Sequence, residues 1–230
     1  SLRGTLVFPA GRTRHHIPVP GSFNGVLRVA LENPVNADLT GESTFLLQNV
    51  ASGRIVLSPL GSLWRYLDNG SDQGTAWRAP GFNDGAWASG PAKLGFGDTQ
   101  ATVINGGPAA NRFVTTYFRR AFSVANAGAF TGLSLRVLRD DGVIVYLNGA
   151  EVFRNNMPAG AVSYATFAGA PVNEPDETNF FAIALSPGVL SNGVNVLAAE
   201  VHQANATSSD LGFDLELMGA GNLPPVVNVG

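Results

Sequence analysis

Short runs of β-branched and aromatic residues fill this chain, and glycine, proline, asparagine and aspartate interrupt them along its whole length. The 28 glycines and 14 prolines are spread over all 230 residues rather than gathered in one segment. Such spacing is typical of many strands joined by turns. No stretch of about 12 residues carries the apolar period of an amphipathic helix. The sequence therefore predicts an all-β protein.

A β-hairpin is the clearest local feature, at residues 143–154 with Asn148-Gly149 as its turn. Asn-Gly tolerates the positive φ that a type I′ turn needs at both central positions. The predicted register pairs residues across the hairpin as follows: Val145 with Val152, and Tyr146 with Glu151.

Alternation of apolar and polar residues predicts the other strands. The segment 211–218 places four apolar side chains on one face: Leu211, Phe213, Leu215 and Leu217. The segment 195–201 is apolar on both faces apart from Glu200, which predicts a strand in the middle of a sheet. Further strands are expected within 113–124, 133–138 and 178–185.

The composition argues against several classes of protein. A net charge of −3 with pI ≈ 5.5 disfavours a sequence-independent nucleic-acid binder, which needs a basic patch. No apolar run reaches about 18 residues, so we expect no membrane span. The absence of cysteine removes disulfides and thiolate chemistry, and three histidines are too few for a histidine-rich zinc site. The chain lacks a starting methionine and a signal peptide, so we expect a processed chain or an excised segment.

Residues 61–219 contain a series of motifs in a characteristic order. They are Trp-Arg-Tyr-Leu-Asp-Asn-Gly at 64–70, Gly-Phe-Asn-Asp-Gly-Ala-Trp at 81–87, Gly-Phe-Gly-Asp at 95–98, Arg-Asp-Asp-Gly at 139–142, Tyr-Leu-Asn-Gly at 146–149, Glu-Val-His-Gln at 200–203 and Ser-Asp-Leu-Gly-Phe-Asp at 209–214. This order resembles a galactose-binding-like β-sandwich (jelly-roll) accessory module of bacterial secreted multidomain proteins. The resemblance implies an antiparallel β-sandwich, which in such folds often holds one structural Ca²⁺.

The two ends of the chain resemble other domains. Gly-Thr-Leu-Val-Phe-Pro-Ala-Gly at 4–11 and Leu-Arg-Val-Ala-Leu-Glu-Asn-Pro at 27–34 are similar to the later strands of a Calx-β domain. The stretch 21–25 carries no carboxylate, so we do not expect the calcium site of such domains there. We expect three parts: 1–50 as a smaller N-terminal β segment, 51–220 as the antiparallel β-sandwich, and 221–230 as a proline-rich linker or the start of a next Ig-like domain.

Glu200 and His202 are the first candidate functional residues, because they share one face of a predicted strand. A carboxylate and an imidazole two residues apart can share a ligand or a proton. A buried carboxylate needs a partner, and structural ion pairs mimic functional sites. The alternative that we favour is therefore a buried ion pair of Glu200 with Arg139 or Arg120. His202 is then hydrogen-bonded at the strand end.

A sugar-binding surface needs an exposed aromatic ring flanked by polar groups. Trp77 beside Arg78 fits this description best, whereas Trp64 and Trp87 are expected in the core. The candidate ligand-binding residues are Trp77, Arg78, Glu200, His202 and Asp210.

Several loops are rich in aspartate and asparagine, whose oxygens are ligands that Ca²⁺ prefers. The candidate Ca²⁺ ligands are Asp68, Asp72, Asp84, Asp98 and Asp140. The same residue types also form turns without any ion, and no EF-hand spacing is present. Both interpretations stay open from the sequence.

Catalytic motifs are absent from the templates that we compared. The chain has no Gly-x-Ser-x-Gly elbow and no glycine-rich phosphate loop followed by lysine. We therefore predict that the chain is not an enzyme. We expect a non-catalytic module of a larger bacterial protein, secreted or at the cell surface, that binds a glycan or a cell-surface polymer. An enzyme using Glu200 and His202 as acid and base is a weaker alternative.

A structural or adhesive role is the main alternative to ligand recognition. The incomplete β segment at 1–50 leaves edge strands to be covered. Neighbouring domains or copies of the same chain can cover them by strand addition, with the tail at 224–230 as a donated strand. Such contacts build an extracellular filament when the rotation between copies does not close.

Overall fold

The computed structural model of the chain describes residues 26–30, 44–48 and 53–221, and these belong to two units. In the first unit, β1 (Val26–Ala30) and β2 (Thr44–Gln48) form an antiparallel pair. The predicted domain boundaries and the Calx-β resemblance rest largely on residues outside the described ranges, so they stay predictions.

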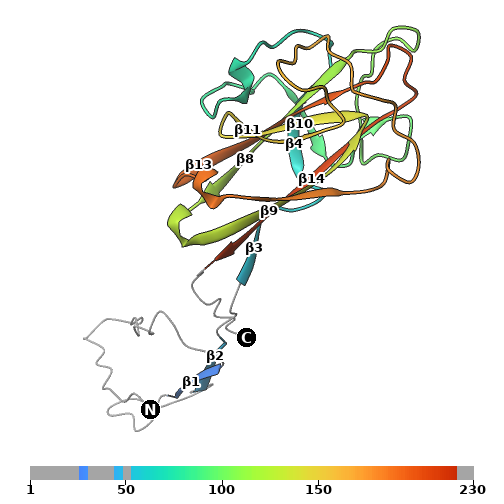
Figure 1. The fold of residues 1–230 in the computed structure, drawn as a ribbon. Coiled ribbons are helices and arrows are strands. Elements are labelled where there is room, and N and C mark those ends of the chain that lie inside the picture. Colours follow the sequence, from blue (N-terminus) through green and yellow to red (C-terminus); the bar gives the residue numbers. More distant parts are fainter. Residues whose placement is uncertain (1–25, 31–43, 49–52, 222–230) are drawn as a thin grey trace. The chain divides into compact units, whose positions relative to one another are not determined.

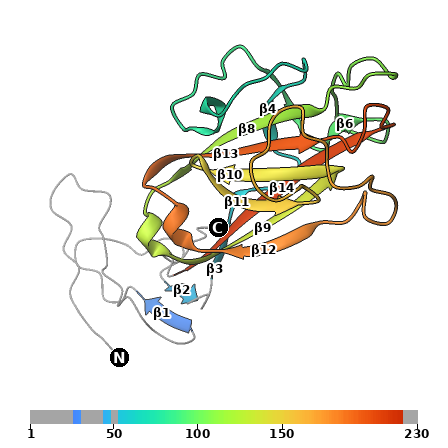
Figure 2. The ribbon, with the colours of Figure 1, turned by 45° about the horizontal axis from the view of Figure 1, so that its top comes forward.

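The second unit, residues 53–221, contains two six-stranded sheets that pack face to face (Figures 1 and 2). The first sheet has the order β11-β10-β13-β8-β4-β5 and is antiparallel throughout. Its strands are β4 (Leu63–Leu67), β5 (Ala88–Pro91), β8 (Thr115–Val124), β10 (Gly142–Leu147), β11 (Ala150–Asn155) and β13 (Gly193–His202).

The second sheet has the order β12-β9-β14-β6-β7, and β3 also pairs with β14. Its strands are β3 (Gly53–Ser58), β6 (Leu94–Phe96), β7 (Thr102–Val103), β9 (Phe130–Asp140), β12 (Phe181–Leu185) and β14 (Leu211–Gly221). All of its pairs are antiparallel except β6 with β7. The prediction of an antiparallel β-sandwich with a smaller N-terminal β segment is confirmed.

Helical structure in the described residues is limited to three 3₁₀ turns: η1 (Ala76–Arg78), η2 (Ala127–Ala129) and η3 (Pro187–Val189). No helix of this part of the chain has the length and apolar character needed to cross a membrane.

The core lies between the two sheets and follows the alternation of the strands. The predicted apolar face of β14 is buried throughout, at Leu211, Phe213, Leu215 and Leu217. Across the core, the Phe213 ring stacks on Phe118 with centroids 4.4 Å apart and meets Trp64 edge-on at 5.0 Å. The predicted central strand, β13, lies between β10 and β8 and is buried on both faces over most of its length.

The hairpin of β10 and β11 forms around the predicted turn, with φ of 54° at Asn148 and 88° at Gly149. Tyr146 lies opposite Glu151 as predicted. The predicted pairing of Val145 with Val152 is wrong. An irregularity after Val145 shifts the register, so this residue lies opposite Phe153.

One end of the sandwich, which we call the loop end, brings together the segments discussed below. Strands β6, β9 and β13 finish there, and β8, β10 and β14 begin there. The register shows this in four pairs: Gly142 with His202, His202 with Thr115, Asp140 with Gly212, and Phe96 with Leu211. Loops from distant parts of the sequence therefore lie together at this end.

Candidate functional site

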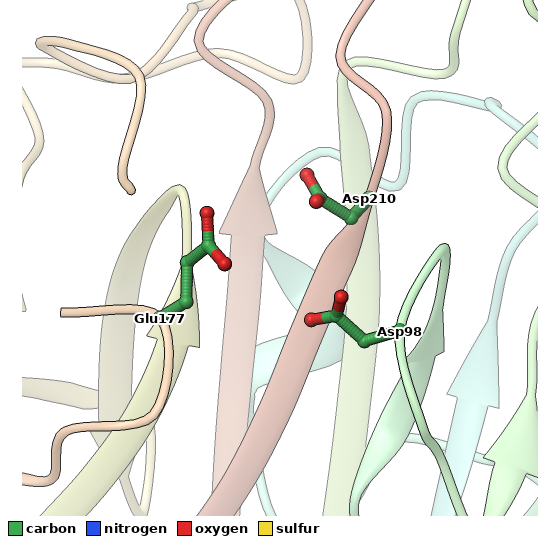
Figure 3. Close-up of side chains that lie close together, drawn as sticks. All are labelled: Asp98, Glu177 and Asp210. Carbon is green, nitrogen blue, oxygen red and sulfur yellow. The ribbon is translucent and has the colours of Figure 1, made fainter. Parts of the chain in front are cut away.

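Three carboxylates converge at the loop end. Asp98 follows β6, Glu177 lies in the loop before β12, and Asp210 immediately precedes β14. One carboxylate oxygen of each lies within 4.8 Å of the others, and Figure 3 shows the three side chains directed toward a common space. Within the described residues, this is the one group of three acidic, histidine or cysteine side chains with such spacing. We call it the acidic cluster.

Two glycines allow β6 to lie close enough to β14 to bring Asp98 beside Asp210. A Cβ on Gly95 would lie 1.8 Å from the carbonyl oxygen of Leu211. Gly97 has a φ of 91°, and a Cβ there would lie 2.5 Å from the Cβ of Asp210. A larger residue at either position would push the two segments apart.

The acidic cluster has an unfavourable balance of charge. Burial and the charges of Asp210 and Asp98 raise the pKa of Glu177, and the positive charge of Lys93 partly offsets this. The Lys93 ammonium group forms an ion pair with Asp98, with Nζ 3.3 Å from Oδ2. One lysine thus faces three carboxylates.

Asp140, at the end of β9, adds a fourth carboxyl group beneath this surface. Its side chain is 1% exposed, and neither of its oxygens has a hydrogen-bond partner. Burial, followed by the charges of Asp141 and Asp210, raises its pKa to about 8. An unpartnered buried carboxyl group is uncommon in folded proteins and calls for an explanation.

Asp141 connects two of the loops that carry the acidic cluster. It is buried, and its oxygens accept hydrogen bonds from the backbone N–H of Val172 at 2.8 Å and of Ala204 at 2.7 Å. Val172 belongs to the loop that leads to Glu177, and Ala204 belongs to the loop that leads to Asp210. Asp141 therefore has a positioning role.

Glu200 and His202 come together as the sequence suggested, but inside the protein. Glu200 accepts a hydrogen bond from the Tyr146 hydroxyl at 2.5 Å and pairs with Arg78 at 3.1 Å. His202 Nε2 lies 3.5 Å from the other carboxylate oxygen of Glu200. Burial raises the pKa of Glu200, but the neighbouring His202, the hydrogen bond from Tyr146 and the charge of Arg78 outweigh burial and lower it overall. The arrangement is the buried ion pair that we favoured.

The arginine partner of Glu200 differs from the expected one. Arg78 forms the pair, whereas Arg139 donates to Asn155 and Arg120 donates to the Leu63 carbonyl. The reason is the loop before β5, which folds over the outer face of the first sheet and brings η1 onto β13.

The predicted sugar-stacking role of Trp77 is wrong for a simple reason of exposure. Trp77 is 0% exposed, and its ring packs edge-on against Tyr117 at 4.8 Å and Tyr146 at 5.7 Å. Arg78 lies over the Tyr146 ring at 4.3 Å. The tryptophan belongs to a second apolar cluster on the outer face of the first sheet.

The five aspartates proposed as Ca²⁺ ligands do not form one group. Asp68 accepts from the N–H of Asn105, Asp72 accepts from the N–H of Gly74, and Asp84 pairs with the buried Arg119 at 2.8 Å. Asp98 belongs to the acidic cluster, and the charge of Asp210 contributes to the raised pKa of Asp140.

Asp210, which we proposed for ligand binding, is part of the acidic cluster. Sequence reasoning missed Glu177 and Lys93 altogether. The acidic run Asn-Glu-Pro-Asp-Glu at 173–177 was the one local signal for Glu177.

No family model matches the chain, and no curated protein matches it. Among solved structures, a calcium-binding mutant of Bacteroides uniformis β-glucuronidase 2 is 18% identical over 73% of this chain and 18% of its own, with a TM-score of 0.48. A β-glucuronidase from an uncultured Clostridium sp. is 14% identical over 84% of this chain and 31% of its own, with a TM-score of 0.48. The β-glucuronidase from Ruminococcus gnavus is 12% identical over 75% of this chain and 30% of its own, with a TM-score of 0.47.

These neighbours are all named as β-glucuronidases, which contradicts our prediction that the chain is not an enzyme, and we no longer make that prediction. The chain spans less than one third of the length of each neighbour. At this level of similarity, neither their activity nor their substrate is transferred to this chain.

Proposed function

We propose that the chain is a carbohydrate-binding β-sandwich module of a secreted or cell-surface protein, and that its loop end binds Ca²⁺ at Asp98, Glu177 and Asp210. The observation that carries this proposal is the convergence of three loop carboxylates above the buried, unpartnered carboxyl group of Asp140.

The charge and chemistry of the acidic cluster support a divalent cation. Three carboxylates within 4.8 Å repel one another, and Lys93 supplies one positive charge against them. Carboxylate oxygens are hard ligands, and Ca²⁺ accepts six to eight of them in flexible geometry. A bound Ca²⁺ would relieve the repulsion and join the loops that carry Asp98, Glu177 and Asp210.

The carbohydrate part of the proposal is supported by exposed aromatic side chains at the same end. Tyr164 is 40% exposed and Phe167 is 41% exposed. Their loop is held at the loop end, because Thr115 donates to the Tyr164 carbonyl at 2.6 Å and Ala168 donates to the Gln203 carbonyl at 2.9 Å. Exposed rings beside polar groups provide the kind of surface on which sugars stack. These two residues replace Trp77 in the proposal.

Calorimetric titration of metal-free protein with Ca²⁺ tests the cation site. We expect one Ca²⁺ per chain in the wild type and at least about tenfold weaker binding in Asp210→Asn, because one charged ligand is lost. Asp72→Asn is the matched control, since Asp72 is exposed and caps a turn. Absent binding in the wild type, or equal loss in both variants, would contradict the cation site.

Binding to a panel of neutral and acidic polysaccharides tests the carbohydrate surface. We expect the double variant Tyr164→Ala, Phe167→Ala to lose about tenfold or more in affinity, since aromatic stacking residues dominate such contacts. Val194→Ala is the control, because Val194 is exposed at the opposite end of β13. A panel without any bound polysaccharide would refute this part while leaving the cation site standing.

A structural role by strand addition is the second candidate function. Within the described residues, β1 and β2 pair only with each other, and a two-stranded pair is marginal by itself. An added strand from a neighbouring domain or from another copy would stabilise it. Negative-stain imaging of the full chain at high concentration tests this role. Filaments would support it, and particles of one size without extension would oppose it.

A further inference from the structure

Asp140 is a buried carboxyl group for which the described residues provide no ion pair and no hydrogen-bond donor. Arg139 precedes it but projects from the other face of β9, since successive side chains of a strand alternate, and Arg139 donates to Asn155 instead. Lys93 forms its ion pair with Asp98. A buried charge without a partner is strongly unfavourable, so Asp140 needs either a proton or a cation.

The register of the second sheet places Asp140 on the same face as Asp210. Asp140 lies opposite Gly212 in the pair of β9 with β14, and Asp210 comes two residues before Gly212. Side chains two apart along a strand share a face, and diagonal neighbours across a pair lie about 7–8 Å apart. The charges of Asp210 and Glu177 are accordingly among those that raise the pKa of Asp140. Asp140 therefore lies beneath the acidic cluster.

Gln203 brings a second unpartnered oxygen to the neighbourhood of Asp210. The residue is fully buried, its Nε2 donates to the Asp210 carbonyl at 3.0 Å, and its Oε1 has no partner. Its main chain is held on both sides, because its N–H donates to the Val114 carbonyl and its carbonyl accepts from Ala168. Two buried side chains near Asp210 therefore offer oxygen atoms that no group of the described residues occupies.

We propose that Asp140 is a fourth carboxylate ligand of the cation at the acidic cluster, and that it makes the site selective for Ca²⁺ over Mg²⁺. This inference rests on the proposed cation site. Ca²⁺ takes six to eight oxygen ligands in flexible geometry, whereas Mg²⁺ keeps several waters and is usually bound by one or two carboxylates. A buried carboxylate fixed at the end of a strand occupies a position where Mg²⁺ would keep water, so it favours the larger ion.

Calorimetric titration of metal-free protein with Ca²⁺ and, separately, with Mg²⁺ tests the inference. We expect the wild type to prefer Ca²⁺ by at least about 100-fold, and Asp140→Asn to lose at least about tenfold in Ca²⁺ affinity with little change for Mg²⁺. Asp214→Asn is the matched control. Asp214 is also a buried aspartate, but the N–H groups of Gly61 and Leu215 already donate to it, so its variant should bind both ions as the wild type does.

Stability measurements separate a ligand from a merely structural residue. In EDTA at pH 8, Asp140→Asn should be at least as stable as the wild type, because the substitution removes an unpartnered buried charge. In Ca²⁺ the order should reverse, since the wild type binds the ion more tightly in its folded state. Equal Ca²⁺ affinity of the wild type and Asp140→Asn, or the same order of stability in EDTA and in Ca²⁺, would overturn the inference.

Crystals of the wild type grown with Ca²⁺ provide a measurement that needs no variant. An ion within about 2.3–2.6 Å of an Asp140 oxygen would support the inference. An ion held by Asp98, Glu177 and Asp210 without Asp140 would overturn it and leave the proposed function intact. Wild-type protein that binds no Ca²⁺ in the titration would refute the proposed cation site and this inference together.

Discussion

Asp140 and Glu200 are both buried carboxyl groups, but their surroundings have opposite effects. Glu200 has partners on three sides, Tyr146, Arg78 and His202, and its pKa is lowered. Asp140 has no hydrogen-bond partner and lies near other acids, and its pKa is raised to about 8. A satisfied carboxylate contributes to the fold, whereas an unsatisfied one indicates a site to be completed.

Asp140 gives the metal-free protein a characteristic dependence on pH. Its pKa rises from 3.8 to about 8 on folding, so between these values the folded state holds a proton that the unfolded state has released. The free energy of unfolding therefore falls as pH rises from about 4 to about 8. We expect Asp140→Asn to remove at least about 1 kcal/mol of this fall, since one pKa unit corresponds to about 1.4 kcal/mol.

Urea unfolding with EDTA at pH 5 and pH 8 measures this difference. The free energies of unfolding of the wild type and of Asp140→Asn should be similar at pH 5. At pH 8 they should differ, with the variant more stable. Two parallel pH profiles would show that Asp140 does not titrate in this range.

Loss of the Glu200 side chain should destabilise the fold. In Glu200→Ala, the buried Tyr146 hydroxyl loses its acceptor, His202 loses the nearby carboxylate, and Arg78 loses its pair. We expect a loss of about 2 kcal/mol or more in the free energy of unfolding. Glu151→Ala is the control. It removes an exposed pair with Arg154 and should cost no more than about 0.5 kcal/mol, measured by the same denaturation.

At the scale of strands, the close approach of β6 to β14 depends on glycine. Gly95 lies opposite Gly212 across this pair, and the space for a side chain at 95 is taken by the backbone of Leu211. Backbone cannot move aside as the end of a flexible side chain can. The geometry of β6 therefore decides the position of Asp98.

Two strand glycines allow a matched comparison of this constraint. Gly95→Ala should lower the free energy of unfolding by about 3 kcal/mol or more, because the new Cβ would overlap the Leu211 carbonyl. Gly132→Ala, in β9, meets no atom within 4 Å and should be neutral or stabilising by up to about 1 kcal/mol. Thermal unfolding of both variants measures the difference. Equal effects would mean that β6 can move away from β14 at little cost.

At the scale of the whole sandwich, a bound Ca²⁺ would join loops that the sheets alone leave separate. A ligand that binds only the folded state stabilises it by about 2.7 kcal/mol at a concentration 100 times its Kd. For a domain of this size, we expect a rise in Tm of roughly 5–10 °C with Ca²⁺ and its reversal by EDTA. Asp98→Asn should show a smaller rise, and Asp72→Asn should behave as the wild type.

Sequence reasoning was most reliable within single strands and across the one hairpin. The buried face of β14, the central place of β13 and the pairing of Tyr146 with Glu151 follow from patterns over a few residues. The irregularity after Val145 and the burial of Trp77 did not follow, because the first is a property of how two strands pair and the second depends on the cluster in which Trp77 packs. Local periodicity contains no information about either.

The order of residues along the chain by itself determined that the protein is all-β and which face of β14 is buried, because alternation belongs to one strand alone. Only the tertiary structure decided that Asp98, Glu177 and Asp210 meet, that Asp140 lacks a partner and that Arg78 neutralises Glu200. These contacts join residues far apart in the sequence. Their distances are set by strand register and by the close approach that Gly95 and Gly97 permit, which no short segment specifies.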